Sequence, residues 1–279
     1  MKTNSELPLC LLGQNNDLNQ YDFVLFHLYK SNKDYRNYYR NQRILFPGRL
    51  MILDNSAYEF FVKGEELNLE EYFEVICELK PDMYILPDVL MNKEKTLVGV
   101  EEFLNNYGMR VLAKSPMSRP LAVVQGNSYL DFLGCLSWYK GWGITRIAIP
   151  FHNSFLKEVG MAVKADIQEG FLNWHNTTIV TDDMLYAMGR VKLVHDLKET
   201  LEKFDHVHLL GSHDPHEKIF YDWIDTMDTG YPVKCAIAGF EFGKEPHKPD
   251  VIIDEFLDKE LEKETRDLIK KNVRIFRGL

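Results

Sequence analysis

The chain has 279 residues, of which 42 are acidic and 33 basic, and its formal net charge is −9. Hydrophobic residues make up 45% of it, an ordinary value for a folded globular protein, and no stretch approaches the roughly 20 apolar residues of a membrane span. The acidic balance argues against a protein that coats nucleic acid, although local clusters of basic residues matter more than the total.

The cysteines lie far apart in the sequence and form no Cys-x-x-Cys pair. This spacing argues against both a disulfide framework and a zinc knuckle. The first residues, MKTNSELPLCLLGQ, are too polar for a convincing signal peptide. We therefore expect a cytoplasmic protein with no membrane partner, no metal and no other cofactor.

Taken in chain order, short runs rich in Val, Ile and Leu alternate with longer segments whose apolar residues follow helical spacing. This alternation is typical of repeated βα units. The predicted strands are residues 23–28, 51–54, 83–88, 121–125, 146–150, 178–181, 206–211 and 224–228. The predicted helices are residues 68–80, 92–106, 128–140, 182–203 and 215–224, with a C-terminal helix near 254–274.

Eight apolar strands, most of them followed by a helix, favour a closed α/β barrel of the (β/α)8 TIM type, formed as a single domain by residues 1–279. An open, doubly wound sheet is the structural alternative. It is disfavoured because no glycine-rich phosphate-binding sequence follows the first predicted strand.

Basic and aromatic residues are concentrated between positions 30 and 49. Arg36, Arg40, Arg43 and Arg49 alternate there with tyrosines, which supplies cations for phosphates and rings for bases. We interpret this segment as an insertion whose four arginines bind a nucleic-acid backbone. The alternative is a solvent-exposed basic face, since most runs of charge serve only that purpose.

Polar side chains stand where several predicted strands end, namely Asp54, Asp88, Gln125 and Asp228. In a barrel these ends meet at one mouth. There, one carboxylate can attack an electrophilic carbon and another can move protons. A carboxylate can also accept the N1 and N2 hydrogens of guanine, while a glutamine amide donates to O6. Attack on C1′ of a guanosine would give a covalent glycosyl-enzyme. A second base could then attack C1′ and release the enzyme.

These motifs resemble those of the tRNA-guanine transglycosylase superfamily, barrel enzymes that exchange guanine in nucleic acid for a 7-deazaguanine. The family's Asp-Ser-Gly-Gly-aromatic turn is similar to the segment from Asp54 to Tyr58. The resemblance implies proton transfer by Asp54 and stacking of Tyr58 on the base. The family's Phe-Asp-Glu-Cys segment is similar to the one at Asp88, which implies that Asp88 binds the guanine edge. Its Val-Gln-Gly is matched at Gln125 and Gly126, which implies contact with the base oxygen.

The strand sequence Leu-Met-Gly of the family resembles the one that ends in Gly211, which implies that this glycine lines the site. The family's nucleophile segment, Asp-x-Phe-Asp with a proline four residues later, is similar to the segment from Asp225 to Pro232. The resemblance implies that Asp228 is the nucleophile and that Asp225 binds substrate. It leaves Asp225 open as the alternative nucleophile.

The cysteines and histidine of the family's zinc subdomain are absent from this chain. Short family members without zinc are associated with phage systems that place 7-deazaguanines in DNA. The resemblance therefore implies DNA as the preferred partner, tRNA as the alternative, and a free 7-deazaguanine as second substrate. An oligomer is left open.

Two other functions compete with this interpretation. One is a metal-dependent hydrolase in which Asp228 is a ligand or base. It is suggested by four histidines that could bind a metal, namely His206, His208, His213 and His216. Alternatively, the chain is a catalytically inactive partner subunit that binds nucleic acid on the same fold.

Overall fold

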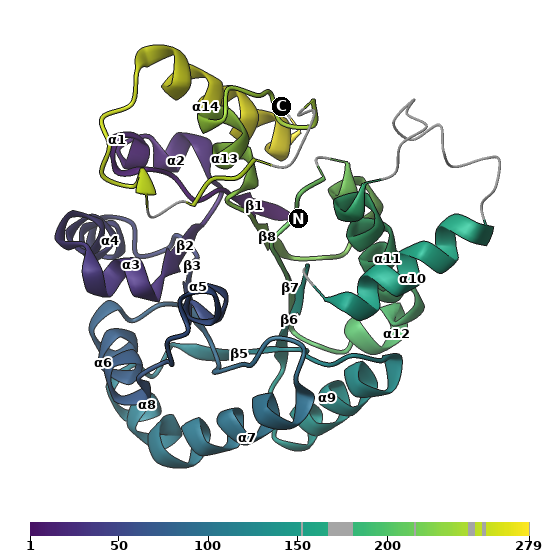
Figure 1. Ribbon diagram of the computed structural model, residues 1–279. Coiled ribbons are helices and arrows are strands. Elements are labelled where there is room, and N and C mark those ends of the chain that lie inside the picture. The colour runs from purple at the N-terminus through teal and green to yellow at the C-terminus, as the bar shows by residue number, and fades with distance from the viewer. Residues whose placement is uncertain (152, 167–180, 215, 245–248, 253–254, 279) are drawn as a thin grey trace.

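Parallel strands form the centre of the molecule. The computed structural model describes residues 1–151, 153–166, 181–214, 216–244, 249–252 and 255–278. Eight strands form one sheet in the order β1-β8-β7-β6-β5-β4-β3-β2, and the paired neighbours are parallel. Figure 1 shows this sheet curled around one axis with the helices outside it. The predicted (β/α)8 barrel is confirmed, and the open doubly wound sheet is excluded because the first strand pairs with the last.

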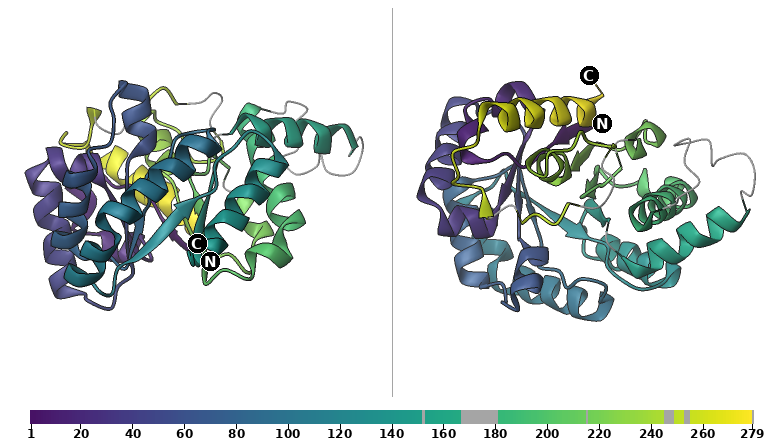
Figure 2. Two further views of the ribbon diagram at one scale, coloured as in Figure 1. Left: turned by 90° about the horizontal axis from the view of Figure 1, so that it is seen from below. Right: turned by 45° about the horizontal axis from the view of Figure 1, so that its top comes forward.

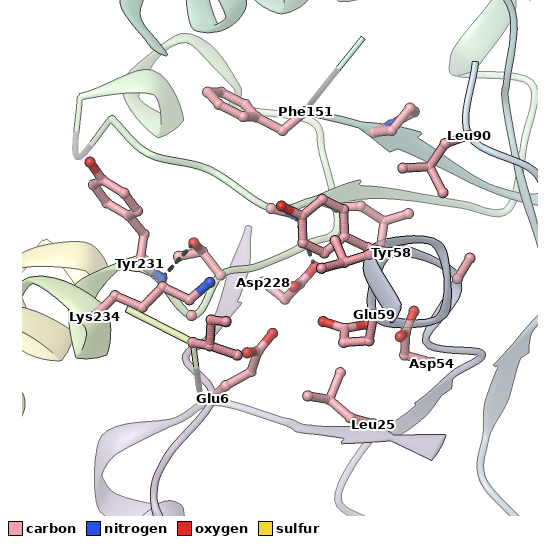
Figure 3. A pocket seen from close by; sticks show the side chains of 18 of the residues that line it. Glu6, Leu25, Asp54, Tyr58, Glu59, Leu90, Phe151, Asp228, Tyr231 and Lys234 are labelled. Atoms are coloured by element: carbon pink, nitrogen blue, oxygen red, sulfur yellow. Dashed lines mark hydrogen bonds between the residues drawn. The ribbon is translucent and has the colours of Figure 1, made fainter. Parts of the chain in front are cut away.

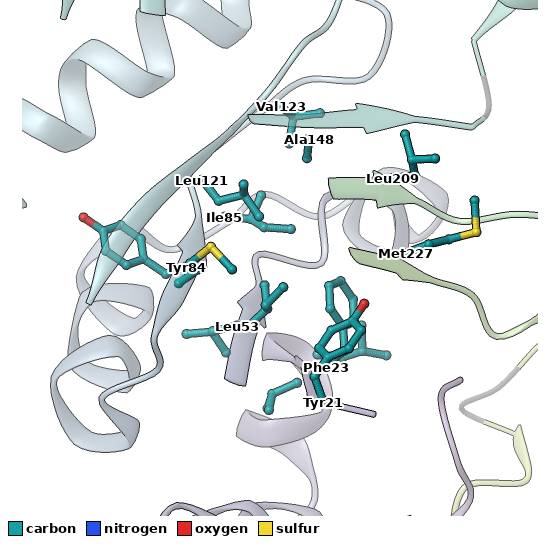
Figure 4. Packing of buried hydrophobic residues seen from close by; sticks show 14 of the residues in the cluster. Tyr21, Phe23, Leu53, Tyr84, Ile85, Leu121, Val123, Ala148, Leu209 and Met227 are labelled. Atoms are coloured by element: carbon teal, nitrogen blue, oxygen red, sulfur yellow. The ribbon is translucent and has the colours of Figure 1, made fainter. Parts of the chain in front are cut away.

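The strands are short and mostly buried on both faces, as expected for strands between a packed interior and a layer of helices. They are β1 (Lys2–Asn4), β2 (Asp22–Leu25), β3 (Met51–Asp54), β4 (Met83–Ile85), β5 (Arg119–Val123), β6 (Arg146–Pro150), β7 (His206–Leu210) and β8 (Thr226–Asp228). Figure 4 shows apolar side chains from seven of these strands meeting in the core, among them Phe23, Leu53, Ile85, Ala148 and Met227. The dense packing gives the strand ends a rigid base.

Side-chain amides link β1 to the segment before β2, where the sheet order leaves a seam. The Asn4 amide donates to the backbone oxygen of Tyr21 at 2.8 Å, and Gln20 N donates to the Thr3 carbonyl at 3.1 Å. Asn19 donates to the Ser5 carbonyl at 2.8 Å. These bonds satisfy backbone groups that a strand ladder would otherwise pair, so the barrel is nearly closed.

Helices cover the outside of the sheet (Figures 1 and 2). They are α1 (Leu9–Leu12), α2 (Asn15–Leu18), α3 (Phe26–Ser31), α4 (Lys33–Leu45), α5 (Ala57–Lys63), α6 (Leu69–Leu79), α7 (Lys93–Phe103), α8 (Met109–Lys114), α9 (Tyr129–Gly141), α10 (Ser154–Asp166), α11 (Asp182–Asp196), α12 (Lys198–Leu201), α13 (Tyr231–Ile237) and α14 (Lys263–Arg277), with a π-helical turn η1 (Leu104–Gly108) and a 3-10 turn η3 (Glu217–Phe220). The helix predicted at 68–80 is α6, and Asn68 caps it, since its side chain accepts from Glu71 N at 3.2 Å.

Some elements differ from those predicted. The helix predicted at 215–224 is reduced to the 3-10 turn η3 within the described residues. The first barrel strand, β1, was not predicted because it is too short and polar to stand out in the sequence. The strand predicted at 178–181 lies outside the described residues, except for Thr181, which caps α11. The C-terminal helix begins at Lys263 and not near 254, because Phe256 and Leu257 are buried and the Leu257 carbonyl accepts from Leu9 N at 3.0 Å.

The basic aromatic segment 30–49 is part of the barrel and not an insertion into it. It contains the end of α3, all of α4 and the connection to β3. Tyr35 and Tyr39 are buried, and Leu25 N donates to the Tyr35 hydroxyl at 3.1 Å. The tyrosines therefore pack α4 onto the sheet and present no rings to a base.

Candidate active site

A cavity of about 360 Å³ opens at the carboxyl ends of the strands. Figure 3 shows side chains from opposite sides of the barrel pointing into it. Six carboxylates line the cavity, and they are Glu6, Asp54, Glu59, Asp88, Asp228 and Asp250. Three of them, Asp54, Asp88 and Asp228, were predicted from the sequence. The others were not, because Glu6 follows the unrecognised strand β1, Glu59 lies on the unrecognised helix α5, and Asp250 lies between elements.

Asp228 ends β8, and only 5% of it is exposed. His208 Nε2 lies 2.9 Å from Asp228 Oδ1, and the Gly211 backbone N–H donates to the same oxygen at 3.4 Å. Gly211 adopts a φ of +66°, which favours glycine and sets the direction of this N–H. Within the described part of the chain no donor reaches Oδ2, so one carboxylate oxygen is held and the other is available to a ligand.

Asp54 ends β3 on the other side of the cavity, and Ser56 N donates to its Oδ2 at 2.7 Å. Burial raises the pKa of the Asp54 carboxyl well above its ordinary value. The negative charge of Glu59 adds to this effect, and that of Asp228 adds a further part. The raised pKa favours the protonated form of this carboxyl group, which is the form that can act as an acid.

The turn that follows Asp54 has an uncommon backbone conformation. Ser56 adopts a φ of +60°, in the left-handed region that non-glycine residues seldom occupy. Its buried hydroxyl accepts from His27 N at 3.2 Å and lies 2.9 Å from His27 Nδ1. Ala57 N donates to Asn55 Oδ1 at 2.9 Å and begins α5. A strained turn fixed by this many bonds is typical of a functional site.

Tyr58 lies on the first turn of α5, and its side chain lines the cavity while 49% of the residue is exposed. Viewed along the barrel in Figure 1, α5 stands over the opening. An aromatic ring in this position can cover a flat ligand bound below it.

Asp88 and Gln125 meet directly. Gln125 Nε2 donates to Asp88 Oδ2 at 2.8 Å, and Asn55 donates to Asp88 Oδ1 at 2.8 Å. Gln125 Oε1 accepts from Met91 N at 2.9 Å, which fixes the orientation of the amide. Burial raises the pKa of the Asp88 carboxyl. Each Asp88 oxygen keeps one lone pair and Gln125 keeps one N–H, so the pair can still bind a ligand edge that has two donors and one acceptor.

Aromatic side chains and one lysine form the opposite wall of the cavity. The rings of His213 and Tyr231 stack at 4.0 Å with an interplanar angle of 11°, and Phe151 lies 4.9 Å from His213. Figure 3 shows Lys234 of α13 reaching into the cavity, with Asp228 between it and Asp54 in that view. Among the described residues the Lys234 ammonium has no anionic partner. The sequence analysis missed this lysine because it lies on a helix and not at a strand end.

Two predicted site residues lie elsewhere. Gly126 does not line the cavity, and a Cβ there would stand 2.2 Å from Asp131 Cβ, so the glycine serves the turn into α9. Asp225 precedes β8 and therefore stands at the amino end of the strand, where its Oδ2 accepts from Val207 N at 2.8 Å. The expected substrate contact of Asp225 is wrong, because the cavity opens at the other end of the same strand.

The four arginines expected to bind phosphates are engaged inside the protein. Arg43 forms a bidentate pair with Asp82 at 3.0 and 3.1 Å. Arg49 pairs with Asp22 at 2.9 Å. Both carboxylates lie at or beside the amino ends of strands, away from the mouth. Arg40 pairs with Glu78, and Arg36 donates to the carbonyls of Tyr29 and Lys30.

The histidines do not converge on one point. His206 and His208 both contact the Thr226 hydroxyl, at 2.7 and 2.8 Å. His213 Nδ1 lies 2.9 Å from Asp183, and His216 N donates to Asp214 Oδ1 at 2.8 Å. Across the residues the structure describes, no three His, Cys, Asp or Glu side chains are arranged to hold a metal ion. This geometry offers no support for the metal-dependent hydrolase.

A buried ion pair that sequence analysis did not find supports the β7 end. Arg190 of α11 and Glu217 of η3 are both fully buried and bond through Nε and Oε1 at 2.6 Å. Arg190 also donates to the carbonyls of Leu210 and Gly211, at 2.8 and 2.6 Å. The pair therefore fixes the loop whose Gly211 N–H contacts Asp228.

Among the helices described, none has the length and apolar character that a membrane crossing requires. Comparison of the chain with protein-family models and with curated protein sequences finds no match.

Proposed function

We propose that the protein is a base-exchange glycosyltransferase that replaces guanine in nucleic acid, preferably DNA, with a 7-deazaguanine. One observation carries the proposal: two aspartates share a cavity at the barrel mouth, Asp54 with a raised pKa and Asp228 with one oxygen held by His208 and Gly211 and the other uncovered. A retaining glycosyl transfer requires one carboxyl group that donates a proton and a second that attacks the sugar.

In the proposed reaction, Asp228 Oδ2 attacks C1′ of the target nucleotide while the bond from C1′ to the purine nitrogen breaks. The electron pair of that bond leaves with guanine, which takes a proton from Asp54. The incoming deazaguanine then returns a proton to the Asp54 carboxylate, and its nitrogen attacks C1′ and releases Asp228. Two successive inversions restore the original configuration at C1′.

Recognition of the base is assigned to Asp88 and Gln125. Their mutual hydrogen bond and the bonds from Asn55 and Met91 fix their orientation before a ligand binds. The two Asp88 oxygens then offer acceptors, and the Gln125 amide offers one donor. This pattern matches the N1–H, N2–H and O6 edge of guanine. The target nucleotide would have to leave its stack to reach them, with Tyr58 covering the base.

The resemblance to the tRNA-guanine transglycosylase superfamily supports the proposal at one further point. Ser56 occupies the third position of the segment that resembles the family's Asp-Ser-Gly-Gly turn. Its φ of +60° is a conformation for which glycine is the ordinary choice. The backbone of this turn thus has the conformation expected of the motif, although the side chain differs.

Nucleic acid needs a cation near the reacting sugar, and the engaged arginines of segment 30–49 do not provide it. Lys234 is placed for this role, because it enters the cavity beside Asp228 and has no anionic partner within the described chain. We assign it to the phosphate next to the target nucleotide. This assignment replaces Arg36, Arg40, Arg43 and Arg49 as the expected phosphate contacts.

A trapped covalent adduct tests the proposal. Protein incubated with guanine-containing DNA or with tRNA is denatured and separated, and adducts are counted with and without 7-deazaguanine. We expect a denaturant-resistant adduct that Asp228→Asn reduces by a factor of at least about 10⁴, as for loss of other catalytic nucleophiles. Asp225→Asn, beside the amino end of the same strand, is the matched control and should retain the adduct.

Nucleoside mass spectrometry of both nucleic acids then identifies the modified pool. Exchange in tRNA alone would replace DNA by the alternative substrate. No adduct and no exchange in either pool would contradict the proposal and favour the inactive partner subunit.

A further inference from the structure

A chain of buried hydrogen bonds leads from the amino end of the barrel to Asp228. His206 Nε2 lies 2.7 Å from Thr226 Oγ1, and Thr226 Oγ1 lies 2.8 Å from His208 Nδ1. His208 Nε2 lies 2.9 Å from Asp228 Oδ1. The four side chains alternate between the neighbouring strands β7 and β8, and His208 also stacks on Phe23 at 5.5 Å.

The chemistry of a hydroxyl group gives this chain a direction. The Thr226 hydroxyl has one hydrogen and contacts two imidazole nitrogens, so it must donate to one ring and accept from the other. If it donates to His208 Nδ1, a neutral His208 carries its hydrogen on Nε2 and donates it to Asp228. If it donates to His206 instead, a neutral His208 turns a lone pair toward Asp228 and the bond to the carboxylate is lost.

The Asp228 end of the chain favours one direction, because a carboxylate oxygen can only accept: the His208 Nε2 that lies 2.9 Å from Asp228 Oδ1 then donates, and Thr226 donates to His208 Nδ1. Burial lowers the pKa of His206 to about 3, so the ring is neutral and has one N–H. With that hydrogen on Nε2, His206 donates to Thr226, and the Thr226 hydrogen is directed to His208. Asp225 Oδ2 lies 3.9 Å from His206 Nδ1, at the end of the chain that is closest to solvent.

We propose that His206 and Thr226 stabilise the Nε2–H tautomer of His208, which donates to Asp228 Oδ1 and leaves Oδ2 directed to the cavity. His208 and Thr226 are then positioning residues for the nucleophile, and His206 acts through them. The inference rests on the proposed function only for the role of Asp228. The hydrogen-bond chain itself is a property of the free protein.

Other charged groups face the chain and must stay constant in a test. They are Glu6, Asp54, Glu59, Lys63, Asp88, Lys234 and Asp250 at the cavity, Tyr21 and Arg190 beside Asp228, and Lys2, Arg146 and Asp225 beside His206. Replacing Thr226 by valine removes the linking hydroxyl, keeps the shape of the side chain and changes none of these charges. Thr226→Ser keeps the hydroxyl and is the conservative rescue.

The first measurement is nitrogen-15 NMR of histidine-labelled free protein, with His208 assigned from the His208→Gln variant. We expect His208 to carry a hydrogen on Nε2 and none on Nδ1 in the natural protein and in Thr226→Ser. In Thr226→Val we expect a mixture of the two tautomers. Hydrogen on Nδ1 of a neutral His208 in the natural protein would overturn the inference, whether or not the protein shows activity.

The second measurement is the pH dependence of adduct formation in a single turnover. Thr226→Val should slow the reaction about tenfold and move the midpoint of the acidic limb upward by about one pH unit, the same factor. Thr226→Ser should restore both. Ser118→Ala, which removes a buried hydroxyl at the amino end of the barrel, should leave the profile unchanged. An unchanged profile in Thr226→Val, or failure of serine to restore it, would overturn the inference.

Discussion

The two sides of the barrel mouth use the same residue type in different ways. On the β3–β5 side, defined by Asp54, Asp88 and Gln125, burial and the neighbouring charges of Glu59 and Asp228 raise the pKa of Asp54. On the β7–β8 side, defined by His208, Gly211 and Asp228, two nitrogens contact one carboxylate oxygen. The environment and not the residue type thus separates an acid from a nucleophile.

The two sides also differ in how they are supported. Behind the β7–β8 side lies the fully buried ion pair of Arg190 and Glu217, which is bonded to the backbone of Gly211. The β3–β5 side depends on amide hydrogen bonds through Asn55 and on the strained turn at Ser56. One side is held by charge and the other by neutral groups, so they should respond differently to substitution.

The largest effect on stability should come from breaking the buried charge. Arg190→Met leaves Glu217 buried without its partner, and we expect the free energy of unfolding to fall by about 3–5 kcal/mol in urea denaturation. The double variant Arg190→Met with Glu217→Leu should recover much of the loss. Lys192→Met, on the same helix but in an exposed pair with Asp196, should change stability by less than about 0.5 kcal/mol. Equal losses of stability in Arg190→Met and Lys192→Met would mean that the buried ion pair matters no more than the exposed one.

Because the pKa of Asp54 is raised, we expect Asp54→Asn to have opposite effects on activity and on stability. Asp54→Asn keeps an acceptor for Ser56 N but cannot release a proton, so adduct formation should slow by about 10²–10³-fold. The raised pKa means that folded Asp54 binds its proton more tightly than the unfolded chain does. The stability it contributes is complete below the ordinary carboxyl pKa of about 4 and is lost as pH rises toward the folded value.

Thermal unfolding between pH 4 and pH 8 measures that loss directly. Stability of the natural protein should decline more steeply over this range than that of Asp54→Asn, and the variant should be the more stable of the two at neutral pH. Parallel curves would mean that Asp54 ionises as an ordinary carboxyl group. The acid and the nucleophile would then no longer be distinguished by their environments.

Sequence patterns predicted the β3–β5 side better than the β7–β8 side. Asp54, Asp88 and Gln125 stand at or just after the ends of apolar strands. This pattern can be recognised from the sequence alone. The roles of His208, Thr226 and Arg190 depend on pairing between β7 and β8 and on packing of α11, which spacing alone does not reveal. The arginines of segment 30–49 were misassigned for the same reason, since their partners Asp22, Glu78 and Asp82 are distant in sequence.

The smallest expected effect concerns Lys234, the lysine that enters the cavity beside Asp228. Lys234→Ala should weaken binding of a guanine-containing oligonucleotide about tenfold and reduce the slope of log affinity against log salt by about 1, the value for one lost phosphate contact. Binding of a free guanine nucleoside, which has no phosphate, should not change. Lys192→Ala removes an equal charge outside the cavity and should alter neither slope nor affinity. An unchanged salt slope in Lys234→Ala would show that this lysine does not contact a phosphate. It would not bear on Asp228, whose role is tested by adduct formation.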